Sequence, residues 1–89
     1  MNWQITQRGF IQFLRLEKSL SKNSIDAYTA DVEKLRRFSE QYSPQLTPLN
    51  IKPDEIRAFL KVITELGLSA TSQARIISGL KGFFGYLLI

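Results

Sequence analysis

The side chains best suited to chemistry in this sequence lie in two short polar segments, residues 20–24 and 68–75. Both segments are rich in hydroxyl and amide groups, and each carries a basic residue, Lys22 in the first and Arg75 in the second. At the start of a helix, backbone N–H groups, hydroxyls and cations converge in a way that suits a phosphate group. Amide side chains can also contact base edges, and Arg can pair with guanine. The two segments therefore favour contact with a nucleic acid.

Helix capping is the simpler explanation for part of this pattern. Ser and Thr are among the leading N-cap residues, so Ser21, Ser69 and Thr71 are expected first of all to cap helices. A solvated helix surface would also accommodate the four polar residues that capping leaves unexplained, which are Lys22, Asn23, Gln73 and Arg75.

The composition argues against an enzyme built from these residues alone. The 89 residues include no cysteine and no histidine, which removes disulfides, cysteine-ligated zinc and the commonest general base. No pair of carboxylates suited to acid–base catalysis stands out, and we expect no metal and no cofactor.

The net charge of +4 is compatible with a phosphate-backbone partner. No signal peptide is evident and no apolar run reaches the roughly 18 residues of a membrane span, so we expect a cytoplasmic protein without a membrane partner.

Four helices account for the spacing of the apolar residues, and no alternation long enough for a strand appears. We expect helices over residues 3–19 and 22–42, a loop with two prolines that includes residues 43–50, and a third helix from Pro53 to just before Gly67. A fourth helix should run from residue 69 or 71 to residue 87 or 88. The predicted fold is an all-α bundle of four helices in one domain, residues 1–89. The expected buried faces comprise Trp3, Phe10, Phe13 and Leu14; Ile25, Tyr28, Val32, Leu35, Phe38 and Tyr42; Ile56, Phe59, Leu60 and Ile63; and Ile76, Ile77, Leu80, Phe83, Phe84 and Leu87.

Three glycines in the last helix need an explanation. Gly79, Gly82 and Gly85 fall with Ser78 on its expected outer face, and together they cost roughly 2–3 kcal/mol in helix propensity. Either another helix or a nucleic-acid backbone approaches closely there, or the end of the helix is irregular.

A basic cluster in the second helix also has two interpretations. Lys34, Arg36 and Arg37 lie close to Glu33 and Glu40. Ion pairs one helical turn apart and a DNA contact explain this cluster equally well.

The sequence resembles the opening of Xer-type tyrosine recombinases of the phage integrase kind. Four stretches carry the similarity in the same order, at residues 10–14, 17–32, 54–60 and 67–87. The resemblance implies a SAM-like four-helix core-binding domain whose second and fourth helices face duplex DNA. It also implies eight DNA-contacting residues, which are Lys22, Asn23, Ser24, Tyr28, Thr71, Ser72, Arg75 and Lys81. From its position alone, Tyr28 is more typical of a half-buried core residue.

The resemblance places the chemistry in a separate catalytic domain that is absent from this chain. No catalytic residue is assigned, and Tyr86 is not taken as the nucleophile of that family. The apolar ending at residues 87–89 is expected where a linker continues into a second domain. The implied partners are double-stranded DNA and other recombinase protomers, and the isolated domain is expected to be monomeric. A SAM-type protein-interaction bundle without nucleic acid is the main alternative, ahead of a helix-turn-helix regulator, which the long proline loop disfavours.

Overall fold

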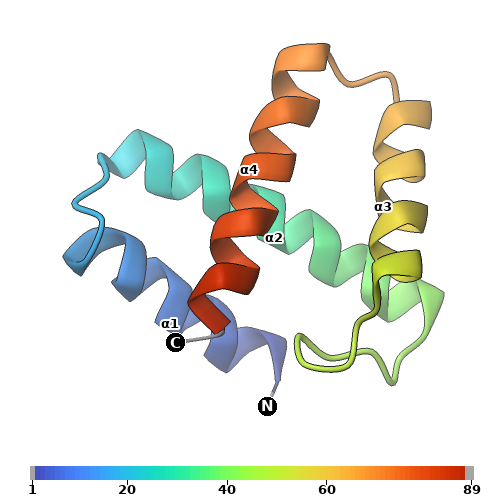
Figure 1. Ribbon diagram of the computed structural model, residues 1–89, viewed down its shortest axis with the longest axis horizontal. Coiled ribbons are helices and arrows are strands. Elements are labelled where there is room, and N and C mark those ends of the chain that lie inside the picture. The colour runs from blue at the N-terminus through green and yellow to red at the C-terminus, as the bar shows by residue number, and fades with distance from the viewer. Residues whose placement is uncertain (1, 88–89) are drawn as a thin grey trace.

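The computed structural model describes residues 2–87, and within them it contains four α-helices and no strand (Figure 1). The helices are α1 (Trp3–Leu16), α2 (Lys22–Tyr42), α3 (Pro53–Glu65) and α4 (Ala70–Leu87). The all-helical bundle predicted from the sequence is confirmed. The expected extension of the last helix to Leu88, and the rest of the apolar ending, lie outside the described residues.

Local interactions explain where the helices begin and end. The Ser21 hydroxyl accepts a hydrogen bond from the backbone N–H of Ser24 at 3.2 Å, and caps α2. In the same way the Ser69 hydroxyl accepts from the N–H of Ser72 at 3.1 Å, so Ser69 caps α4 and Thr71 lies inside the helix.

The ends of α1 and α3 are set by left-handed backbone. The first helix ends at Leu16 and not at Ser19 as expected, because Ser19 has a φ of 52°, which a right-handed helix does not allow. Gly67 has a φ of 78° just beyond α3, as expected for a glycine at the end of a helix.

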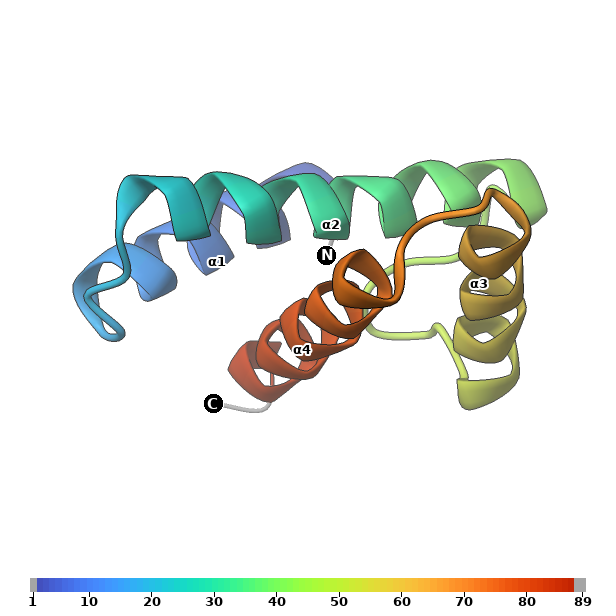
Figure 2. The ribbon, with the colours of Figure 1, turned by 90° about the horizontal axis from the view of Figure 1, so that it is seen from above.

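The helices α2 and α4 cross near the centre of the molecule. In Figure 1 α4 passes in front of α2, and Figure 2 shows α1 alongside the first part of α2. The third helix lies near the end of α2, where the rings of Phe38 and Phe59 are 5.5 Å apart between centroids. The result is a flat domain with principal extents of 33 × 31 × 17 Å. None of the helices in residues 2–87 combines the length and the apolar character needed to cross a membrane.

One apolar core fills the space between the helices. Phe83 is completely buried and contacts Trp3 and Phe10, with ring centroids 6.2 and 5.2 Å apart. The indole N–H of Trp3 also donates to the carbonyl of Leu46 at 3.1 Å, which ties the proline loop to α1. Every residue of the buried hydrophobic core belongs to one of the faces predicted from the sequence: Trp3, Phe10, Leu14, Ile25, Val32, Leu35, Phe59, Ile63, Ile76, Leu80 and Phe83.

Two residues that we expected in the core lie at the surface instead. Tyr42 is 58% exposed, because it is the last residue of α2 and stacks on Phe38 at the rim of the core. Ile77 is 40% exposed, because it borders a shallow groove between α3 and α4.

Candidate functional site

The polar starts of α2 and α4 each lead into the point where the two helices cross, and a glycine makes this crossing close. Gly79 of α4 is buried, and a methyl group at this position would lie 2.9 Å from Cδ1 of Tyr28 on α2. The expectation that Gly79 lies on the outer face was therefore wrong, and close approach of another helix is the correct explanation for this glycine. The other two glycines differ, since Gly82 has only Phe10 at 4.0 Å and Gly85 faces open space.

A buried ion pair joins the two helices at the same crossing. Both carboxylate oxygens of Asp31 accept hydrogen bonds from Arg75, one from Nε and one from Nη2, each at 3.0 Å. The Asp31 side chain is completely buried, whereas that of Arg75 is 42% exposed. The hydrogen bonds to Asp31 raise the pKa of the Arg75 guanidinium above its ordinary value. We call the group formed by Tyr28, Asp31, Arg75 and Gly79 the crossing cluster.

The sequence analysis did not identify Asp31 as a functional residue. Its signal was nevertheless present, because Asp31 stands between Tyr28 and Leu35 at helical spacing, on the edge of the apolar face of α2. An acidic residue at such a position is seldom buried without a partner. The basic partner lies 44 positions further along the chain, so helical spacing within α2 does not reveal it.

The structure places two of the eight predicted site residues at this crossing and two more one helical turn before it. Tyr28 and Arg75 belong to the crossing cluster itself, and each has a second predicted residue one turn before it. Ser24 precedes Tyr28 by four residues and Thr71 precedes Arg75 by four, so each pair shares one side of its helix. In Figure 1 the first turns of α2 and α4 both lie along the upper side of the molecule.

The other four predicted residues lie around this group and not within it. Ser72 is held by Ser69, whose hydroxyl lies 3.1 Å from its own, and Asn23 is exposed. Lys22 lies towards α1, where it lines a small hollow together with Arg15. Lys81 follows Arg75 by six residues, which places it about 120° away around the helix axis, beside the groove between α3 and α4.

The basic cluster of α2 consists of ion pairs. Arg36 donates to Glu33 through Nη2 at 2.8 Å and contacts Glu40 at 2.7 Å, while Arg37 and Lys34 each lie 3.7 Å from an acidic oxygen. The hydrogen bond from Arg36 lowers the pKa of Glu33 from 4.5 to about 2, and Gln7 adds a second hydrogen bond. The geometry of this cluster therefore agrees with ion pairs one helical turn apart, which was one of its two interpretations, the other being a DNA contact.

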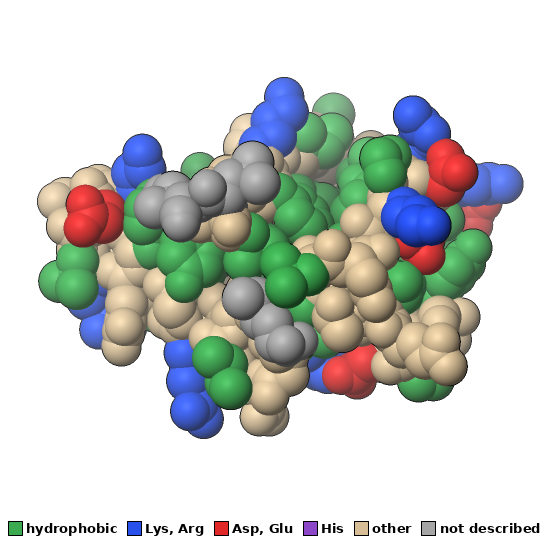
Figure 3. Space-filling model, turned by 60° about the horizontal axis from the view of Figure 1, so that its bottom comes forward, with side chains coloured by type: hydrophobic (Ala, Val, Ile, Leu, Met, Phe, Trp, Pro, Cys, Tyr) green, Lys and Arg blue, Asp and Glu red, His purple; other side chains and the backbone are tan. Residues whose placement is uncertain are grey.

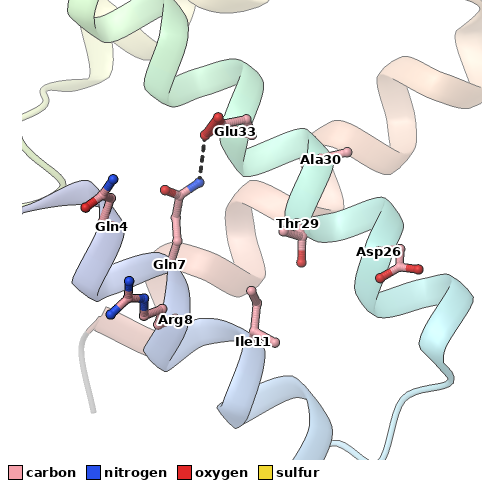
Figure 4. A pocket seen from close by; sticks show the side chains of 8 residues that line it. All are labelled: Gln4, Gln7, Arg8, Ile11, Asp26, Thr29, Ala30 and Glu33. Carbon is pink, nitrogen blue, oxygen red and sulfur yellow. Dashed lines mark hydrogen bonds between the residues drawn. The ribbon is translucent and has the colours of Figure 1, made fainter.

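The broadest hollow described lies on the other flank of α2, between α2 and α1 (Figure 4). The amide of Gln7 donates to Glu33 across its upper part at 3.2 Å. None of the eight predicted site residues lines this hollow, whose walls are formed by Gln4, Gln7, Arg8, Ile11, Asp26, Thr29, Ala30 and Glu33.

Comparison with known proteins identifies the family. Residues 8–88 match the model of the family described as "Phage integrase, N-terminal SAM-like domain". The chain belongs to this phage integrase SAM-like family. The resemblance stated from the sequence is confirmed, and the four-helix architecture agrees with a SAM-like bundle.

Curated relatives of this phage integrase SAM-like domain are Xer tyrosine recombinases. The chain is similar to tyrosine recombinase XerD of Chlorobaculum tepidum, with 31% identity over 97% of the chain and 28% of that protein. It is similar to tyrosine recombinase XerC of Leptospira interrogans (33% identity, 93% and 26%) and to XerD of Pasteurella multocida (35%, 88% and 26%). The chain thus spans about a quarter of the length of the curated relatives it matches. No solved structure matches it.

Proposed function

We propose that this domain is the DNA-binding part of a tyrosine recombinase and that it contacts duplex DNA with the first halves of α2 and α4. Its membership of the phage integrase SAM-like family and its Xer relatives support the recombinase assignment. The chain itself supports the surface, because two helix starts rich in hydroxyl and amide groups flank one crossing. This shared crossing is the single observation that carries the proposal.

The chemistry of the polar groups near this crossing suits a nucleic-acid backbone, with Thr71 exposed and Ser24 and Tyr28 half-buried. Ser24, Thr71 and the Tyr28 hydroxyl are neutral hydrogen-bonding groups of the kind that position a protein on phosphates. Lys22 adds a cation, and the adjacent Arg15, which the sequence analysis did not select, adds a second one next to it. Asn23 is exposed at the start of α2 and has the amide needed for a base edge. In this proposal Lys81 contacts DNA only at the margin.

We assign strand cleavage and rejoining to a separate catalytic domain, as in the family resemblance. Tyr86 does not serve as a nucleophile in this proposal. Its ring lies between Phe10 and Phe13, and its hydroxyl lies against Gly9. Incubation of this chain with supercoiled DNA should accordingly give neither nicks nor a covalent adduct.

Binding of a labelled duplex at several salt concentrations tests the proposed function. Neutralising about two to three phosphates, with Lys22, Arg15 and at the margin Lys81, would give a log–log salt slope of about −2 to −3 and an affinity no better than micromolar at physiological salt. Lys22→Ala should weaken binding and make the slope shallower by about 0.9. Lys52→Ala is the matched control, because Lys52 is also exposed but lies at the start of α3 beside Phe84. No binding by the parent at low salt, or equal effects of the two variants, would contradict the proposal.

A protein-interaction role has one specific observation in its favour. Ile56, Leu60, Ile77 and Phe84 border the apolar groove between α3 and α4. Figure 3 brings the lower side of the molecule forward and shows that hydrophobic side chains are also gathered there. Within a recombinase this face would meet protein, either another part of the chain or a neighbouring protomer. We expect the isolated domain to be monomeric in sedimentation equilibrium, and a stable dimer of a chain that does not bind DNA would favour the adaptor role.

A further inference from the structure

Among the described residues, Asp31 is the one acidic residue whose side chain is completely buried, and it accepts hydrogen bonds from Arg75. The two oxygens of Asp31 accept from Nε and Nη2 of Arg75 at 3.0 Å, which is a bidentate arrangement. Lys34 lies 3.7 Å from one of the same oxygens. Because the carboxylate is 0% exposed, its two oxygens face protein groups and not solvent.

This arrangement leaves only part of the Arg75 guanidinium available to a ligand. A guanidinium has five N–H donors in a rigid plane, and the pair with Asp31 occupies two of them. The remaining donors are on Nη1 and on the second position of Nη2, and the side chain is 42% exposed. The plane of these donors is therefore set by α2, although Arg75 itself belongs to α4.

Gly79 is what allows Arg75 to reach Asp31. It follows Arg75 by four residues, so the two share the stripe of α4 that faces α2. A methyl group at position 79 would meet Tyr28 at 2.9 Å and would lie 3.7 Å from Oδ2 of Asp31. The close contact and the ion pair are thus adjacent parts of one arrangement.

Building on the DNA-binding role proposed above, we infer that Asp31 is a positioning residue for the DNA surface. It fixes the guanidinium of Arg75 in one orientation, so that Arg75 meets DNA as a directed hydrogen-bond donor and not as a mobile cation. Because the Asp31 charge offsets that of Arg75, the pair adds little to the release of counterions from DNA. Arg75 then contributes to the geometry of binding, whereas Lys22 contributes to its salt dependence.

The salt dependence of duplex binding by Asp31→Asn tests this inference on the 89-residue chain. The variant frees Arg75 to bind a phosphate as an ordinary cation, so the log–log slope should become steeper by about 0.9 and binding at low salt should tighten. Asp54→Asn is the matched control, because it changes the net charge equally but breaks only the exposed pair with Arg57 on α3. An unchanged or shallower slope for folded Asp31→Asn, or an equal steepening in both variants, overturns the positioning role.

A measurement on the parent protein covers the case in which Asp31→Asn does not fold. In a ¹H–¹⁵N NMR spectrum, the Nε–H signal of Arg75 should exchange with solvent much more slowly than that of Arg57, and it should persist at saturation with a random-sequence duplex. Loss of the signal on binding, or exchange as fast as that of Arg57, shows that Asp31 does not hold Arg75 and overturns the inference. A parent that binds no DNA at low salt gives a different result, which overturns the proposed function and the positioning role with it.

Discussion

At the scale of single residues, one side chain predicted to contact DNA also joins the two central helices. Arg75 was selected for its basic charge at a polar helix start, but its guanidinium is the partner of the buried carboxylate of Asp31. Removing one member of a buried pair leaves the other charge without compensation, which costs more than the pair contributes. A loss of DNA binding in an Arg75 variant therefore needs a stability measurement beside it.

Arg75→Ala should lower the free energy of unfolding by about 3 kcal/mol, near the lower end of the range for broken buried pairs because Arg75 is partly exposed. Arg57→Ala is the control, since its pair with Asp54 is exposed and should contribute less than about 1 kcal/mol. Urea denaturation of both variants and the parent checks this. Equal losses of stability in the two variants would show that the buried Asp31–Arg75 pair contributes no more to stability than the exposed pair of Arg57 and Asp54.

The lowered pKa of Glu33 predicts that the stability of the domain depends on pH. Its pKa in the folded protein is lowered from 4.5 to about 2 by the hydrogen bond from Arg36. The stabilisation it gives is therefore complete above about pH 4.5 and is lost as the pH falls towards 2. After screening by solvent we expect about 1 kcal/mol. The melting temperature of the parent should fall more between pH 5 and pH 2 than that of Glu33→Gln. Parallel curves of melting temperature against pH would contradict this assignment.

At the scale of the helices, one glycine sets how closely α2 and α4 approach. Gly79 packs against Tyr28, whereas Gly85 on the same helix faces open space. The two positions carry the same residue in the same helix, so substitution by alanine separates helix propensity from packing.

Gly85→Ala should stabilise the domain by about 0.5–1 kcal/mol, because alanine favours the helix and meets no neighbour. Gly79→Ala should destabilise it by about 1–2 kcal/mol in spite of the same gain, because its methyl group displaces the Tyr28 ring. Denaturant midpoints of the two variants give the comparison. Stabilisation by Gly79→Ala would show that the crossing is not closely packed.

The sequence predicted the helices and the core well, and the contacts between helices poorly. Apolar spacing identified every residue of the buried hydrophobic core, because that spacing is a local property of each helix. The cap at Ser69 and the stop at Gly67 were local in the same way. By contrast, the contact of Gly79 with Tyr28 and the pairing of Arg75 with Asp31 depend on how two helices cross. Spacing along one helix contains no information on the angle at which two helices cross, and of the eight candidate site residues only Tyr28 and Arg75 belong to the crossing cluster.

At the scale of the whole molecule, the domain presents two chemically different surfaces. It is only 17 Å thick, and the polar starts of α2 and α4 lie along the upper side in Figure 1. The apolar groove lies between α3 and α4, and hydrophobic side chains also gather across the lower side of the molecule (Figure 3). A recombinase domain that contacts DNA on one side and protein on the other requires two such surfaces.

NMR titration of the ¹⁵N-labelled chain with a short duplex at low salt tests the central claim most directly, because it maps the contacted surface residue by residue. Our account predicts the largest chemical-shift changes at residues 22–28 and 71–75, with small changes in α3 and in the hollow between α1 and α2. Largest changes at the groove residues Ile56, Leu60 and Ile77, or along Gln7 and Thr29, would contradict it, as would a spectrum that the duplex leaves unchanged.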